Sequence, residues 1–166
     1  MKNLPACTTC KNLKATLHCG ICQESVCKSC VQFSDHESFA FMKEVPKDLE
    51  HGIYCIPCYN EKVVPELESY NQTMEEARNV IVYMKNQGKE SRLIRSSQEP
   101  VRVEDCADRE ETLMRLAFYA AKANFNAIIG VDISSQKSGK TSYKVIKWSG
   151  TGIPAQVNSS QLKRRY

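Results

Sequence analysis

The stretches CTTCKNLKATLHCGICQESVCKSC, residues 7–30, and YCIPC, residues 54–58, decide the fold of this chain. They contain four Cys-x-x-Cys pairs, which supply eight of the nine cysteines in the sequence. Two residues between paired cysteines let both sulfurs reach one tetrahedral Zn²⁺, and two such pairs complete a four-sulfur site. We therefore expect two structural zinc ions per chain, held by the following residues: Cys7, Cys10, Cys19, Cys22, Cys27, Cys30, Cys55 and Cys58.

Two other uses of these cysteines are disfavoured. A disulfide framework requires a secreted, oxidising context, and the N-terminal sequence MKNLPACTTC lacks the apolar core of a signal peptide. Iron–sulfur proteins usually carry their cysteines as one tight run plus a remote ligand.

No window of the sequence approaches the roughly 18 apolar residues of a membrane span. We therefore expect a cytoplasmic protein, in a reducing compartment where thiols stay metal-bound.

The formal net charge of +4 is distributed unevenly over the 166 residues. Residues 1–62 contain seven lysines and seven acidic residues and sum to zero. Because a zinc ion with four thiolates carries a net negative charge, the metal-bound region becomes acidic. This charge disfavours nucleic acid or anionic lipid as the ligand of that region. Residues 159–166 form a basic tail with Lys163, Arg164 and Arg165.

Residues 1–62 are predicted to fold as a zinc module. A region of about 60 residues is marginal in the apolar surface that it can bury, whereas one structural zinc contributes about 10–16 kcal/mol of binding energy to folding. The residues from Val31 to Tyr54 are expected to fold as a loop or short helix over the second site, and the last cysteine pair to lead directly into a helix. Six apolar residues are expected to form a small core between the metals: Leu13, Leu17, Ile21, Val26, Val31 and Phe33.

The order of the cysteines resembles that of the FYVE-type zinc finger family. A first pair is followed by HCGICQESVCKSC at residues 18–30, and a distant last pair precedes Tyr59. The resemblance covers residues 7–58 and implies a treble-clef fold with interleaved ligation. One zinc would bind Cys7, Cys10, Cys27 and Cys30, and the other Cys19, Cys22, Cys55 and Cys58. Spacing alone also permits sequential pairing.

The segment before the third cysteine departs from this family. Members that bind phosphatidylinositol 3-phosphate carry a basic, histidine-rich run there, whereas this chain has LKATLH at residues 13–18, with Lys14 as its only lysine. A phosphoinositide headgroup needs several charge-assisted hydrogen-bond donors. We therefore expect the fold without the lipid function, and we expect His18 to be a packed side chain rather than a metal ligand.

Residues 66–87, within a connecting segment of residues 63–90, are predicted to form a helix. Pro65 stands at its start, where a missing N–H costs nothing, and Gly88 follows its end. A stripe with the seven-residue period of a coiled coil comprises Leu67, Tyr70, Met74, Ala77, Ile81 and Met84. The stripe is expected either to pack on the next domain or to join a second copy of the chain, and we predict a homo-oligomer.

Residues 91–158 are predicted to form a small α+β domain with an antiparallel sheet. SRLIRS and PVRVE are short extended segments on either side of Pro100. Asp108 and Glu111 resemble a capping box, which starts a helix that runs to about Ala123 and buries Leu113, Leu116, Ala117, Ala120 and Ala121. Asn124, which tolerates the left-handed conformation, ends it. Further strands are expected at NAIIGVDIS, SYKVIKW and IPAQV, with SSQKSGK as a polar turn.

The segment AAKANFNAIIGV, residues 120–131, and the later GTGIPA, residues 150–155, resemble the YbjQ family, which was once named for heavy-metal binding. The match includes residues 126–131 and the pair Gly150-Thr151, while Asn124 stands where the family usually has glycine. The resemblance implies a small α+β fold that often assembles into rings, and it implies no established catalysis.

No catalytic constellation is recognisable in the sequence. All three histidines lie within residues 1–62, and four-cysteine zinc sites leave no open coordination position. SQKSGKTS, residues 135–142, lacks the first glycine of a phosphate loop. Cys106 has no partner for a metal site and is expected to be an ordinary, partly buried cysteine. We predict a non-enzymatic, zinc-binding interaction or adaptor protein; the alternative is binding of nucleic acid or an anionic membrane through the basic C-terminal side.

Overall fold

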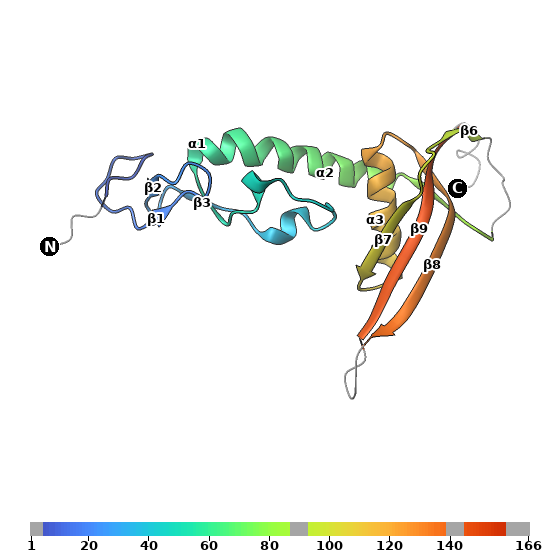
Figure 1. Cartoon of the computed structure of the whole chain (residues 1–166). Helices are drawn as coiled ribbons and strands as arrows, with labels where there is room; N and C mark the ends of the chain where they lie inside the picture. The colour runs from blue at the N-terminus through green and yellow to red at the C-terminus, as the bar shows by residue number, and fades with distance from the viewer. Residues whose placement is uncertain (1–4, 87–92, 139–144, 159–166) are drawn as a thin grey trace. The chain divides into compact units, whose positions relative to one another are not determined.

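The computed structural model describes residues 5–86, 93–138 and 145–158 (Figure 1). The chain divides between Asn71 and Gln72 into two compact units, each with its own buried core. The fold is mixed α+β, with strands that are mostly antiparallel. Among the described residues, no helix has both the length and the apolar character that crossing a membrane requires. The predicted basic tail, residues 159–166, lies outside the described residues.

The first unit contains two small antiparallel sheets and the start of a long helix. β1 (Leu17–His18) pairs with β2 (Ser25–Val26), and β3 (Val31–Phe33) pairs with β4 (Ile53–Cys55). Two short 3₁₀ turns, η1 (His36–Phe39) and η2 (Lys47–Leu49), connect β3 to β4. After β4 the chain continues without a break through α1 (Ile56–Cys58), a π-helical turn (Tyr59–Val63) and α2 (Val64–Arg78). The prediction that the last cysteine pair leads directly into a helix is confirmed.

The core of the first unit leaves out two of the six apolar residues that the sequence predicted for it. Val26 and Val31 are buried and Leu17 and Ile21 pack against the core, but Leu13 and Phe33 are 70% and 66% exposed. The prediction for these two residues was wrong, because one lies in a loop and the other ends a three-residue strand, beyond what so small a core can cover. His18 is also exposed rather than packed, since neighbouring side chains on a strand point to opposite faces.

The helix predicted over residues 66–87 is shorter, because α2 ends at Arg78. The side-chain amide of Asn79 donates to the backbone oxygen of Glu75 at 3.1 Å and closes the last turn. Ile81–Met84 form strand β5 instead, which pairs in parallel with β8 (Ala127–Ser138). The predicted seven-residue stripe therefore loses its last two members, and the proposed helix end at Gly88 lies outside the described residues.

Pairing with a buried neighbour explains why β5 is a strand. Ile81 lies opposite Ala127 and Val82 opposite Ile128, and both partners on β8 are fully buried. Three β-branched residues in succession, Val80 to Val82, favour extended structure. This non-local pairing outweighs the local helical pattern, so the α+β sheet begins at Ile81 and not within the predicted domain of residues 91–158.

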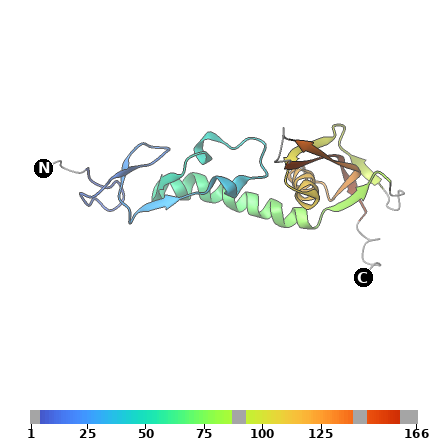
Figure 2. The same ribbon diagram turned by 90° about the horizontal axis from the view of Figure 1, so that it is seen from below.

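The second unit is a twisted sheet with one helix against it. Its strands follow the order β5-β8-β9, and both β6 (Leu93–Ser96) and β7 (Val101–Cys106) pair with the far side of β9 (Val145–Val157). All pairs except β5 with β8 are antiparallel. Figure 2 shows α3 (Arg109–Lys122) lying against the sheet. The predicted antiparallel α+β sheet is thus confirmed, with one parallel edge added.

The β8–β9 hairpin is longer than predicted. β8 continues through Ser138, so most of the predicted turn SSQKSGK is strand, and β9 is one continuous strand rather than two. Gly150 and Gly152, both in β9, allow neighbouring elements to pack closely against the strand. A Cβ at position 150 would lie 2.7 Å from Thr112 Cγ2 of α3, and one at position 152 would lie 2.8 Å from Ile128 Cδ1. Glycine at these positions lets the neighbouring elements approach closely.

The start and end of α3 agree with the predictions. The Asp108 carboxylate accepts from the Glu111 N–H at 2.7 Å, and Glu111 accepts in turn from the Ala107 N–H at 2.6 Å. Asn124, with a φ of +58°, ends the helix in the left-handed conformation. Of the predicted buried residues Leu113 is only half-buried, and the rest, Leu116, Ala117, Ala120 and Ala121, are buried. Cys106 is 1% exposed and belongs to the core beneath α3, so it is more buried than expected.

Candidate metal centres

The eight predicted cysteines gather into two groups of four in the first unit. Within each group all four sulfurs lie within 4.8 Å of one another. One group contains Cys7, Cys10, Cys27 and Cys30, and the other contains Cys19, Cys22, Cys55 and Cys58. The first pair is thus combined with the third and the second with the fourth, which is the interleaved arrangement. All nine cysteines of the chain are free of disulfide bonds.

The distances between sulfurs fit a tetrahedral metal ion. Cys10 Sγ lies 3.7 Å from Cys27 Sγ, and Cys22 Sγ lies 3.8 Å from Cys55 Sγ. Four sulfurs placed at the usual zinc–sulfur distance of about 2.3 Å at the corners of a tetrahedron are about 3.8 Å apart. Each group can therefore hold one metal ion with little movement of its side chains.

Two tight turns position the first cysteine pair of each group. Cys7 accepts the Lys11 N–H through its backbone oxygen at 2.9 Å, and Cys19 accepts the Gln23 N–H in the same way at 2.9 Å. Lys11 and Gln23 both have a φ of +62°, a left-handed conformation that reverses the chain after the pair. This shared geometry was not predicted from the sequence, where its only signal is a long polar residue directly after each pair.

Backbone hydrogen bonds tie these turns to the strands. Thr8 N–H donates to Ser25 O of β2 at 2.8 Å, and Gly20 N–H donates to Ile53 O of β4 at 2.8 Å. The Cys27 N–H donates to Cys7 Sγ at 3.4 Å across the first group. In this way the two small sheets fix the positions of cysteines that are far apart in the sequence.

His51 packs against the turn that contains Cys19 and Cys22. A Cβ added to Gly20 would lie 2.3 Å from Cγ of the His51 ring, so this position accepts only glycine without rearrangement. Tyr54, which is fully buried, meets the ring of His51 at 6.2 Å and the ring of Tyr59 at 6.0 Å, both edge-on. Tyr59, the aromatic residue that follows the last cysteine in the sequence, is therefore part of the packing around the second four-cysteine group.

Each group has a buried side and an exposed side. Cys7, Cys27, Cys19 and Cys55 are buried, whereas Cys10 and Cys22 are exposed. The four buried cysteines belong to the hydrophobic core of the unit. A metal ion in each group would therefore complete the core and be a structural part of it.

The thiols within one group differ in acidity. Backbone hydrogen bonds, first from Cys10 and then from Cys27, lower the pKa of Cys7 from 9.0 to about 6. A hydrogen bond with the Cys27 side chain raises the pKa of Cys30 to about 12. Without metal, the group thus combines a thiolate with a thiol that keeps its proton at neutral pH. A divalent cation that binds all four sulfurs must displace the remaining protons, so binding weakens as the pH falls.

The second group shows the same contrast. Burial acts to raise the pKa of Cys19, but backbone hydrogen bonds from Cys22, Cys55 and Ile21 outweigh it and lower this pKa to about 7. Burial also raises the pKa of Cys58 far above its ordinary value. The backbone thus already favours a negative sulfur in each group, where a cation would bind.

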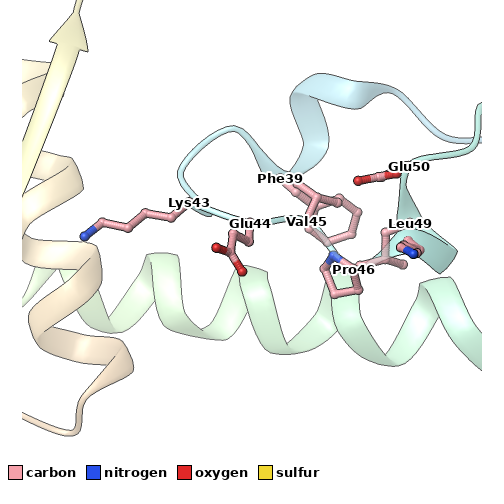
Figure 3. Close-up of a pocket in the computed structure, with 8 residues that line it drawn as sticks. Phe39, Lys43, Glu44, Val45, Pro46, Leu49 and Glu50 are labelled. Carbon is pink, nitrogen blue, oxygen red and sulfur yellow. The ribbon is translucent and has the colours of Figure 1, made fainter.

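A hollow of about 800 Å³ lies in the same unit, within residues 39–50 (Figure 3). Phe39, Val45, Pro46 and Leu49 supply its apolar surface, and charged side chains of both signs, Lys43, Glu44, Lys47 and Glu50, complete its lining. The described residues that line it include none of the eight cysteines. The hollow therefore has a mixed apolar and charged lining.

Compared with known proteins, the chain matches no family model, no curated protein and no solved structure. The resemblances to FYVE-type fingers and to the YbjQ family therefore stay predictions.

Proposed function

We propose that the chain is a non-enzymatic, zinc-dependent interaction protein whose first unit is a FYVE-like, treble-clef double finger. The observation that carries this proposal is the pair of four-cysteine groups with tetrahedral sulfur spacing. Four thiolates without carboxylate or water ligands are typical of structural zinc. Nine free cysteines suit a reducing compartment, and we place the protein in the cytoplasm.

An interaction role is supported by the apolar side chains that the first unit leaves uncovered. Leu13 and Phe33 are exposed large apolar residues on a unit of about 70 residues, where a fold of this size can least afford to leave apolar surface unburied. The hollow within residues 39–50 adds an apolar floor with charges of both signs around it. In this proposal zinc builds the surface and a protein partner covers it.

The second unit, in this proposal, is a YbjQ-like domain that joins copies of the chain. Strand β6 pairs only with β9 among the described residues, and all four of its residues are exposed. Leu93 and Ile94 on it are 45% and 64% exposed. An exposed edge strand with aliphatic side chains can pair with another chain. We place self-association at this edge and not at the predicted helical stripe. Helix α2 ends at Arg78, so the last two residues of the stripe, Ile81 and Met84, belong to a strand.

We expect Ile94→Glu to convert an oligomer of the full, zinc-loaded chain into a monomer. A charge on the edge strand opposes strand pairing between copies, while the exposed position spares the fold. Sedimentation equilibrium at tens of micromolar is the measurement, with Leu13→Glu as a control that introduces the same charge in the first unit. A wild-type chain that is strictly monomeric, or an oligomer that survives Ile94→Glu, would refute self-association through β6.

A further inference from the structure

Positive charge is segregated at the C-terminal end of the sequence. Asp132 is the last acidic residue, and residues 133–166 contain seven lysines and arginines without any acidic residue. Residues 1–132 contain 16 basic and 19 acidic residues and therefore carry a net charge of −3. Such separation favours an anionic partner for the basic end.

The first part of this basic segment forms a two-stranded ribbon. β8 and β9 pair along their whole length, with Ser138 opposite Val145. β5 pairs with β8 only as far as Val131, and β7 pairs with β9 only as far as Trp148. Residues 136–138 and 145–147 therefore continue beyond the neighbouring strands as a ribbon two strands wide. Figure 1 shows β8 and β9 extending past the end of β7. We call these residues the basic ribbon.

The two lysines of the basic ribbon lie on opposite faces. Lys137 pairs with Ile146, and Lys147 pairs with Gln136; because neighbours on a strand alternate, the two lysines point to different sides. Both are exposed. Lys147 forms an ion pair with Asp105 at 2.6 Å, but both side chains are at least half exposed, and such pairs contribute only about 0–1 kcal/mol. Both lysines can therefore reach an external anion.

We propose that the basic ribbon binds double-stranded DNA by entering its major groove. The major groove of B-form DNA is about 12 Å wide and admits a two-stranded β-ribbon. Lysines on the two faces would then meet phosphates on the two walls of the groove, which fixes the orientation of the ribbon. Gln136, at the pair next to Lys137, supplies amide groups of the kind that read base edges.

Two other anionic partners fit the ribbon less well. Membrane-surface elements separate an apolar face from a charged face, whereas here Ile146 shares its face with Lys137 and Val145 shares its face with Lys147. Double-stranded RNA has a deep, narrow major groove that protein side chains do not enter. The mixed character of both faces therefore favours B-form DNA.

The test compares Lys137→Ala/Lys147→Ala with the control Lys62→Ala/Lys122→Ala, which removes the same charge from exposed positions outside the ribbon. The probe is a labelled DNA duplex of about 20 base pairs, and binding to the full, zinc-loaded chain is followed by fluorescence anisotropy over a range of salt concentrations. At about 0.1 M salt we expect the ribbon variant to bind at least tenfold more weakly, with a salt slope smaller by about two, because two phosphate contacts are lost. The control should stay within about twofold of wild type.

Unchanged thermal unfolding of both variants would show that the fold is intact. Equal weakening by the two double variants, or no duplex binding by the wild type at tens of micromolar in low salt, would overturn the proposal. Binding to phosphatidylserine vesicles or to an RNA duplex of the same length as tightly as to DNA would overturn it as well.

Discussion

Replacing Cys55 with serine should unfold the first unit while the second unit keeps its structure. Cys55 ends β4, is 2% exposed and belongs to the second four-cysteine group. Serine does not replace a thiolate as a zinc ligand, and a structural zinc supplies about 10–16 kcal/mol of folding energy. That exceeds or matches the whole stability of a typical domain, about 5–15 kcal/mol. The second unit has a separate core, so it should persist.

Hydrogen exchange read by mass spectrometry reports this outcome region by region. We expect loss of protection over residues 5–71 and native protection over residues 93–138. Cys106→Ala is the matched control, since Cys106 is as buried as Cys55 but lies in the other unit, outside both groups. It should leave the first unit protected. Full protection of the first unit in the Cys55→Ser protein would contradict a metal-dependent fold.

Leu116→Ala should destabilise the second unit by about 2–5 kcal/mol, the usual cost of truncating a buried leucine. Leu116 is fully buried in α3 and packs with Val103, Ile128 and Val131 between helix and sheet. Its Cδ1 would lie 3.1 Å from a Cβ at Gly150, so the helix already lies as close as glycine allows. The helix and the sheet can therefore move little to fill the cavity that the Leu116→Ala substitution leaves.

Urea unfolding followed by the fluorescence of Trp148 measures this loss, because Trp148 is the only tryptophan and packs against the same core. Leu113→Ala, at a half-buried position of the same helix, serves as the control and should cost markedly less. Equal losses for the two variants would show that α3 does not pack on the sheet as described.

The parts of the fold that the sequence predicted are those set by short-range chemistry. Cysteine spacing identified all eight residues that gather into the two groups, and Asp108 with Glu111 marked the start of α3. Asn124 marked its end, since few other residues adopt a positive φ there. Each Cys-x-x-Cys pair and each end of α3 joins residues within a few positions of each other, so the pattern and the structure have the same cause. The combination of cysteine pairs that are far apart in the sequence was implied only by the resemblance to FYVE-type fingers.

The parts that could not be predicted depend on residues far apart in the sequence. Ile81 and Met84 satisfy a helical period, but their pairing with β8, more than 40 residues later, makes them a strand. Gly150 and Gly152 stand outside the two predicted strands SYKVIKW and IPAQV, yet both lie within β9, where Thr112 and Ile128 approach the backbone. The left-handed turns at Lys11 and Gln23 have no strong sequence signal, since glycine or asparagine is the usual residue at such positions.

The number of zinc ions per chain tests the central claim most directly. Elemental analysis of the full chain, purified after expression with sufficient metal, should give two zinc ions per polypeptide, because two separate groups of four sulfurs have tetrahedral spacing. Their removal by a chelator should unfold the first unit. One zinc or fewer per chain, with the first unit still folded, would contradict the account.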